Sequence, residues 1–128
     1  MSFAASDGEA MRREVMGEDY VDLAMGAADC FSRPLQEFLN EHAWGSTWLR
    51  SGLPLKTRSL CTCAMLAALG KTAELKGHIR GAVRNGATVV EIQEVLLHSA
   101  VYAGAPAAVA AFRSANEALK ELSFDILK

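Results

Sequence analysis

The chain has 128 residues, of which 51% are hydrophobic and 22% charged, and its formal net charge is −2. This length suits one domain with a real core and leaves no room for a second catalytic domain. The nearly balanced charge excludes the basic stripe of a nucleic-acid-binding surface, so we expect no nucleic-acid partner. No apolar run approaches the roughly 20 residues of a membrane span, so we expect no membrane partner either.

The N-terminal residues and the cysteines indicate a cellular location. The sequence MSFAASDGEAMRREV lacks the basic-then-apolar order of a signal peptide, which predicts a cytoplasmic protein. The three cysteines are an odd number, and a reducing cytosol would leave them free. We expect them to be small core residues. The many alanines and apolar residues exceed what one small core can hide, which favours a homo-oligomer.

Apolar residues recur at helical spacings along the chain, and Gly and Pro separate these segments. No stretch alternates with a period of two over a useful length, so we predict an all-α fold of about six to seven helices. The expected helices span, approximately, residues 7–16, 18–30, 34–42, 55–69, 72–85, 88–103 and 106–122.

Several residues are expected to mark the ends of these helices. Ser32 is a possible cap for the helix that starts at Pro34. Gly86 stands where a left-handed helix end is wanted, and Thr88 with Glu91 forms a capping box for the next helix. The segment AWGSTWLRSGLP, residues 43–54, contains two Gly and a Pro and is predicted to be a structured loop.

A series of motifs in fixed order runs through residues 44–108: W-G-x-x-W-x-R-x-G-L, T-R-S, E-L-x-x-H, R-N-G-x-T, E-I-x-E-V-L-L and Y-x-G-x-P-A-A. These motifs closely resemble the carboxymuconolactone decarboxylase family, and the resemblance covers about residues 14–119. It implies a single domain over residues 1–128 with the all-helical alkylhydroperoxidase D-like fold. It also implies a ring-like homo-oligomer such as a hexamer, and no metal or organic cofactor.

The reaction that the resemblance implies is decarboxylation of 4-carboxymuconolactone to 3-oxoadipate enol-lactone, in the β-ketoadipate pathway of aromatic catabolism. This small-molecule partner is an unsaturated lactone with a carboxylate on its sp³ ring carbon. As CO₂ leaves, the lactone itself accepts the electrons. The protein then has to supply a hydrogen-bond donor for the carbonyl oxygen, an apolar, water-free environment for the departing carboxylate, and a general acid.

His78 is the expected catalytic residue, either as the general acid or as the donor to the oxyanion. Glu74 lies one helical turn earlier and is expected to orient the imidazole; an exposed Glu–His pair is the alternative. An Arg is the preferred anchor for the spare carboxylate of the substrate, because its guanidinium binds carboxylates in a bidentate way. Arg58 is the first candidate, since it precedes the deeply apolar part of its helix and is expected to be partly buried. The others are Arg50, Arg80 and Arg84.

Two aromatic pairs are further candidates for binding the substrate. His98 and Tyr102 lie a turn apart in an apolar helix, where they line the pocket or form a core or interface pair. Trp44 and Trp48 either line the site and exclude water from it, or fill part of the hydrophobic core. Val109 follows Pro-Ala-Ala, where such decarboxylases often have Asn, which indicates a relative of the standard lactone.

Two other functions stay open. One is a thiol-dependent peroxidase, because the superfamily also contains thiol reductases with a Glu, two Cys and a His. Placing that His on His78 puts the three redox positions on other residue types: Ser59, Lys71 and Glu74. Cys61 and Cys63 do not replace them, because they diverge by about 200° on a helix and cannot bridge. The other is a non-catalytic oligomer that binds small carboxylates.

Overall fold

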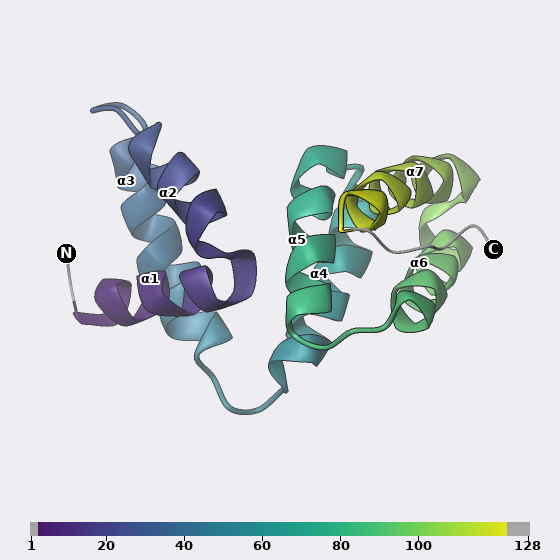
Figure 1. The fold of residues 1–128 in the computed structure, drawn as a ribbon, viewed down its shortest axis with the longest axis horizontal. Helices are drawn as coiled ribbons and strands as arrows, with labels where there is room; N and C mark the ends of the chain where they lie inside the picture. Colours follow the sequence, from purple (N-terminus) through teal and green to yellow (C-terminus); the bar gives the residue numbers. More distant parts are fainter. Residues whose placement is uncertain (1–2, 123–128) are drawn as a thin grey trace. The chain divides into compact units, whose positions relative to one another are not determined.

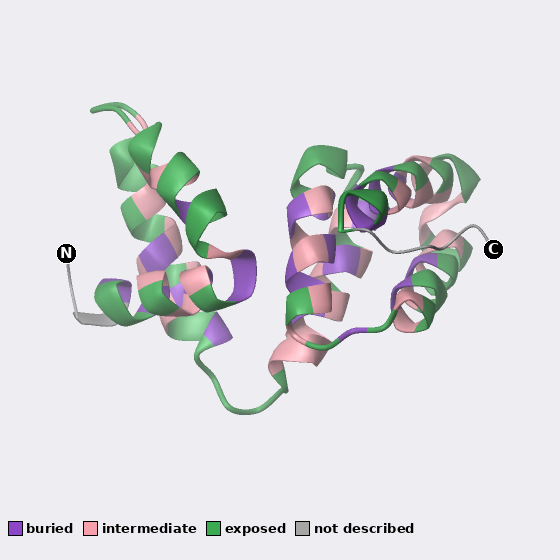
Figure 2. Cartoon of the chain, in the orientation of Figure 1, coloured by how far each residue is buried: buried purple, intermediate pink, exposed green. Residues whose placement is uncertain are grey.

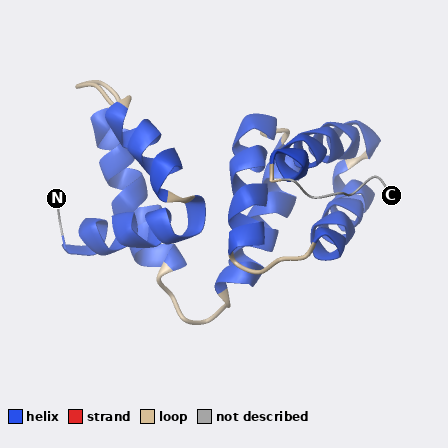
Figure 3. Ribbon diagram, in the orientation of Figure 1, coloured by secondary structure: helices blue, strands red, loops and turns tan. Residues whose placement is uncertain are grey.

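The structure is a computed structural model that describes residues 3–122. All regular structure in this range is helical, which confirms the predicted all-α fold (Figure 3). In chain order, the elements are α1 (Phe3–Met16), α2 (Glu18–Gly26), α3 (Arg33–Phe38), the π-helix η1 (Leu39–Trp48), α4 (Leu55–Leu69), α5 (Thr72–Arg84), α6 (Val89–Ala103) and α7 (Ala105–Glu121). Within residues 3–122, none of the helices combines the length and the apolar character that crossing a bilayer requires.

The helices group into two compact units, Met1–Leu55 and Lys56–Lys128. Unit 1 contains α1, α2, α3 and η1, and unit 2 contains α4 to α7 apart from the first residue of α4 (Figure 1). Each unit has an apolar core of its own. The single domain expected over residues 1–128 stays a prediction.

The core of unit 1 is built around two tryptophans. Trp44 and Trp48 lie four residues apart on η1, are 6% and 8% exposed, and stack with ring centroids 4.8 Å apart. They pack in one cluster with Val15, Met16 and Val21. We predicted a loop over residues 43–54, and this prediction is wrong for residues 43–48, which belong to η1. The predicted loop followed from the local Gly and Pro content, whereas burial of the two indole rings stabilises helical structure there.

A buried polar contact joins three helices of unit 1. Arg12 of α1 is only 6% exposed, and its Nη1 donates to Gln36 Oε1 at 2.8 Å and to Asn40 Oδ1 at 3.0 Å. Asn40, at the start of η1, is fully buried. Burial lowers the pKa of Arg12 from its ordinary value. Because a buried cation needs hydrogen-bond acceptors, the two amide oxygens fix α1 against α3 and η1.

The core of unit 2 lies between α5, α6 and α7, whose buried residues Figure 2 shows. Leu75 and Ile79 of α5 and Leu96 of α6 are at most 1% exposed. Cys63 and Ala67 bring α4 into the same cluster. This packing fixes the backbone of α5, the helix that carries the expected catalytic histidine.

The predicted helix ends in unit 2 are confirmed. The Thr88 hydroxyl accepts from the Glu91 backbone N–H at 3.0 Å, and the Glu91 carboxylate accepts from the Thr88 backbone N–H at 3.0 Å. Gly86 has a φ of +96°, which favours glycine. The capping box of Thr88 and Glu91 and the positive φ of Gly86 therefore define the turn between α5 and α6.

Two predictions in unit 1 are wrong, and one aspartate explains both. The second helix ends at Gly26 rather than at Cys30. The Asp29 carboxylate accepts from the backbone N–H groups of Phe31 and Ser32, which closes a turn at this point. Ser32 precedes α3 but does not cap it, because its hydroxyl donates to Asp29 instead.

A first prediction concerns the close contact between α1 and η1. A Cβ at Gly8 would lie 1.8 Å from the carbonyl oxygen of Asn40 and 2.6 Å from the backbone nitrogen of Gly45. Both atoms are backbone, so the two helices would have to separate. We expect Gly8→Ala to lower the free energy of unfolding by about 3 kcal/mol, measured by urea denaturation. Gly26→Ala is the control, because a Cβ there meets nothing within 4 Å. Equal stability of the two variants would contradict this packing.

Candidate active site

His78 is a partly buried imidazole on α5. It lies between Leu75 and Ile79, which are both fully buried, and its own side chain is half-buried. Burial lowers the pKa of His78 to about 4, from an ordinary value of 6.5. The imidazole is therefore neutral at pH 7, with one ring nitrogen as a donor and the other as an acceptor.

Glu74 lies one turn before His78 and is exposed to solvent. A carboxylate in water exerts a weaker field than a buried one, because the surrounding dielectric constant is high. Burial accounts for the lowered pKa of His78. The orienting role of Glu74 stays a prediction.

A hydrogen bond joins the first turns of α4 to the end of α5. Asn85 Nδ2 donates to Ser59 Oγ at 2.9 Å, and Ser59 is fully buried. Asn85 follows His78 by seven residues, so the two lie on the same face of the helix. Arg58 is the neighbour of Ser59 and is half-buried, as expected. We did not predict the Ser59–Asn85 contact; its signals are a Ser in an apolar helix and an Asn before Gly86.

The alternative arginine anchors are exposed or engaged in ion pairs. Arg80 pairs with Glu121 of α7, beside a pair of Lys76 with Glu117 at 2.9 Å. The other two candidates, Arg50 and Arg84, are exposed. Arg58 is more buried than Arg50 and Arg84, and its role as the carboxylate anchor stays a prediction.

His98 and Tyr102 are brought together by α6. Their ring centroids lie 5.4 Å apart, with the rings tilted by 51°. With Met65 of α4, they line an open pocket of about 470 Å³. His78 is not among the residues that line it, and Tyr102 is 82% exposed. That this pair binds the substrate stays a prediction.

Trp44 and Trp48 take the alternative role that we expected, as a plug in the apolar core of unit 1. Their buried rings have little surface left to offer to a ligand within that unit. The second expected role, exclusion of water from a bound substrate, stays a prediction.

Burial makes one of the three cysteines, Cys63, unsuited to thiol chemistry. All three are free, and burial raises the pKa of Cys63 to about 12, so its thiol is not a nucleophile at pH 7. Cys30 and Cys61 are exposed, so the expectation that all three are core residues is wrong for two of them. Within residues 3–122, no group of three or more His, Cys, Asp or Glu side chains could hold a metal ion.

Comparisons with known proteins give consistent matches. The sequence model of the carboxymuconolactone decarboxylase family matches residues 33–117. A 4-carboxymuconolactone decarboxylase of Acinetobacter baylyi is 44% identical over 115 residues, which cover 90% of this chain and 86% of the relative. A nitrosuccinic acid decarboxylase of Metarhizium robertsii is 40% identical over 116 residues, which cover 91% of this chain and 81% of the relative.

The pKa of His78 leads to a prediction about stability. The unfolded chain binds a proton at this histidine below about pH 6.5, whereas the folded chain does so only near pH 4. Stability therefore falls as the pH drops from 6.5 to 4, by up to about a hundredfold in the unfolding equilibrium constant. Urea denaturation between pH 4 and 7 should show that His78→Gln loses this dependence, whereas His42→Gln, a change at an exposed histidine, keeps it. Parallel curves for wild type and His78→Gln would refute the burial of the imidazole.

Proposed function

The chain belongs to the carboxymuconolactone decarboxylase family, and from this premise we propose that His78 and Arg58 act in the decarboxylation of a lactone carboxylate, with 4-carboxymuconolactone as the first candidate. Both relatives are decarboxylases. The chain is accordingly a carboxy-lyase, an enzyme that releases CO₂ from a carboxylated substrate. The half-buried, neutral imidazole of His78 is the observation that carries the assignment of roles.

The substrates named for the two relatives share a four-carbon unit. Nitrosuccinic acid is a succinate with a nitro group on the carbon beside one carboxyl group. 4-Carboxymuconolactone carries its carboxylate on a ring carbon that also bears an acetate arm, so it contains the same succinate unit. In both compounds, a group on that carbon accepts electrons. We infer that the site recognises two carboxylates on adjacent carbons and tolerates different electron-accepting groups.

The proposed step exchanges one CO₂ for one proton. The bond between the departing carboxylate and its carbon breaks, and the electron pair passes into the accepting group. That group is the nitro group in one compound, and the carbonyl of the lactone, reached through its C=C bond, in the other. A proton then adds to a carbon of the resulting anion. Because the substrate holds the electrons, this step needs no cofactor, and a dry site favours neutral CO₂ over the carboxylate.

His78 is suited to deliver that proton. Its imidazole is neutral in the free protein, because burial disfavours the charged form. A bound dicarboxylate brings two negative charges, which raise the pKa of a buried imidazole. The histidine then gains a proton when the substrate binds and passes it to the carbon, with Glu74 holding the ring from one turn away.

Arg58 is proposed to hold the carboxylate that remains in the product. It is half-buried, where a charge-assisted hydrogen bond is stronger than in water. The adjacent Ser59 is fixed by its hydrogen bond to Asn85, so the backbone at Arg58 is held in place. A guanidinium anchor at this position would orient the departing carboxylate relative to the imidazole.

The proposal includes a cytoplasmic location and a homo-oligomer, with a hexamer as the first expectation. The three free cysteines fit a reducing compartment. Large apolar side chains on α4 and α6 are exposed, and exposed apolar surface of this kind favours contact with another copy. They are Met65, Leu69, Leu97, Val101 and Tyr102.

The reaction is tested with three compounds: 4-carboxymuconolactone, nitrosuccinate and unsubstituted succinate. We expect CO₂ release from at least one of the first two and none from succinate, which lacks an electron-accepting group. His78→Asn should lower kcat by about 100- to 1000-fold, because proton transfer is lost. Arg58→Gln should mainly raise KM, and His42→Asn is the unaffected control. Full activity of His78→Asn would refute the roles, and binding without any turnover would favour the non-catalytic alternative.

The oligomer is tested by light scattering coupled to size-exclusion chromatography. We expect the wild type to elute as one species larger than a monomer. Val101→Glu replaces one of these exposed apolar side chains with a charge and should shift the mass towards the monomer. Lys120→Gln, at an exposed position of α7, lowers the net charge by the same amount and should leave the mass unchanged. A monomeric wild type would contradict the proposal.

A further inference from the structure

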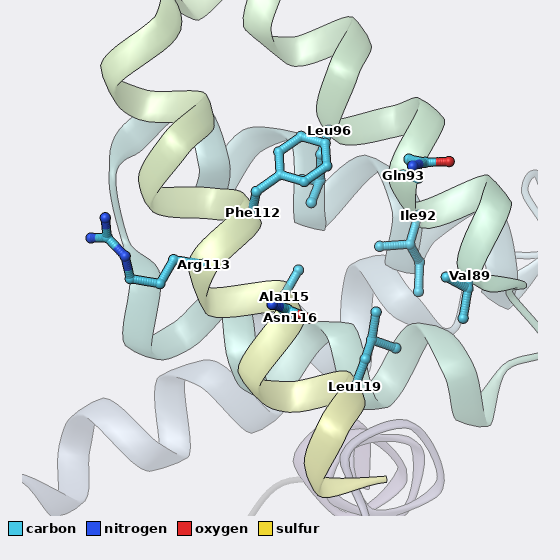
Figure 4. A pocket seen from close by; sticks show the side chains of 9 residues that line it. All are labelled: Val89, Ile92, Gln93, Leu96, Phe112, Arg113, Ala115, Asn116 and Leu119. Atoms are coloured by element: carbon cyan, nitrogen blue, oxygen red, sulfur yellow. The ribbon is translucent and has the colours of Figure 1, made fainter. Parts of the chain in front are cut away.

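A pocket between α6 and α7 has no part in the proposed reaction. Its volume is about 450 Å³, which is typical of small-molecule sites, and neither His78 nor Arg58 lines it (Figure 4). Most of its wall is apolar. These side chains are Val89, Ile92, Leu96, Phe112, Ala115 and Leu119. The wall therefore suits a compact apolar body.

One polar atom at this pocket lacks a partner. Asn116 lines the pocket, and its Oδ1 is buried without a hydrogen bond among the described residues. A buried acceptor left unsatisfied is costly, and such atoms in native structures call for an explanation. A ligand that brings an O–H or N–H donor into the pocket would satisfy this oxygen.

A cation stands one turn away from this amide. Arg113 also lines this pocket, although its guanidinium extends away from Ile92 and Leu119 in Figure 4. It is exposed and makes no ion pair within residues 3–122, so its side chain is able to turn towards a ligand. The nearby carboxylates of α7 are engaged elsewhere, because Glu117 pairs with Lys76 and Glu121 pairs with both Lys76 and Arg80. The pocket thus offers one positive charge, which suits one carboxylate.

We propose that this pocket binds a small aromatic monocarboxylate that carries a hydroxyl group. The carboxylate pairs with Arg113, the hydroxyl donates to Asn116 Oδ1, and the ring packs against the apolar wall around Phe112. This ligand differs from the compact dicarboxylate of the proposed reaction. The inference goes beyond the proposed function and does not depend on it.

The test is an NMR titration of the ¹⁵N-labelled full chain with three probes. 4-Hydroxyphenylacetate has both polar groups, phenylacetate lacks the hydroxyl, and 4-methylphenol lacks the carboxylate. We expect saturable shifts at amides of α6 and α7. Binding of 4-hydroxyphenylacetate should be about tenfold tighter than that of either other probe, because each of those loses one polar contact. The absence of saturable shifts on these two helices would overturn the proposal.

Variants assign the two contacts. Asn116→Leu should bring 4-hydroxyphenylacetate to the affinity of phenylacetate, and a preference that persists would overturn the role of the amide. Arg113→Gln, a change at an exposed position, should weaken both carboxylates about tenfold and leave 4-methylphenol unchanged. Arg33→Gln, at an exposed arginine of unit 1, is the matched control. His78→Asn should keep full binding; loss of binding in that variant would place the ligand in the reaction site instead.

Discussion

Burial of the His78 imidazole is the constraint on which the proposed chemistry depends. Leu75 and Ile79 anchor α5 in the core of unit 2, and the histidine between them is drawn out of water with the helix. A desolvated imidazole stays neutral until a negative charge arrives beside it. In the proposed reaction, binding of the substrate therefore protonates His78, which then has the proton to donate to the carbon.

A site that reads a succinate unit explains how one fold serves substrates as different as a lactone and a nitro acid. In the proposed site, the two carboxylates set the orientation of the substrate, and the electron-accepting group needs only enough space. The hydrogen bond between Ser59 and Asn85 holds α4 against the end of α5, with Arg58 beside it. In such an arrangement, the electronics of the reaction come from the substrate, and the protein supplies position, desolvation and a proton.

Local signals predicted unit 2 well and unit 1 poorly. Apolar spacing, Gly86 and the Thr88–Glu91 box place α4, α5 and α6 within one residue of their observed ends. The π-helix η1 escaped prediction, because only burial of its indole rings against distant residues favours a helix there. Arg12 also escaped, because a charged residue on a helix normally faces solvent. The motif singled out His78, which the structure places half-buried on α5, and its catalytic role stays a prediction. The Ser59–Asn85 bond joins residues 26 apart in the sequence, so it could not be predicted without the fold.

The most direct test is the pKa of His78 itself, measured by NMR of the imidazole with and without 2-methylsuccinate. This compound has both carboxylates but no electron-accepting group, so it should bind without reacting. The account predicts a pKa of about 4 in the free protein and a rise of at least about one pH unit in the complex. A value near 6.5 in the free protein, or no change on binding, would contradict it.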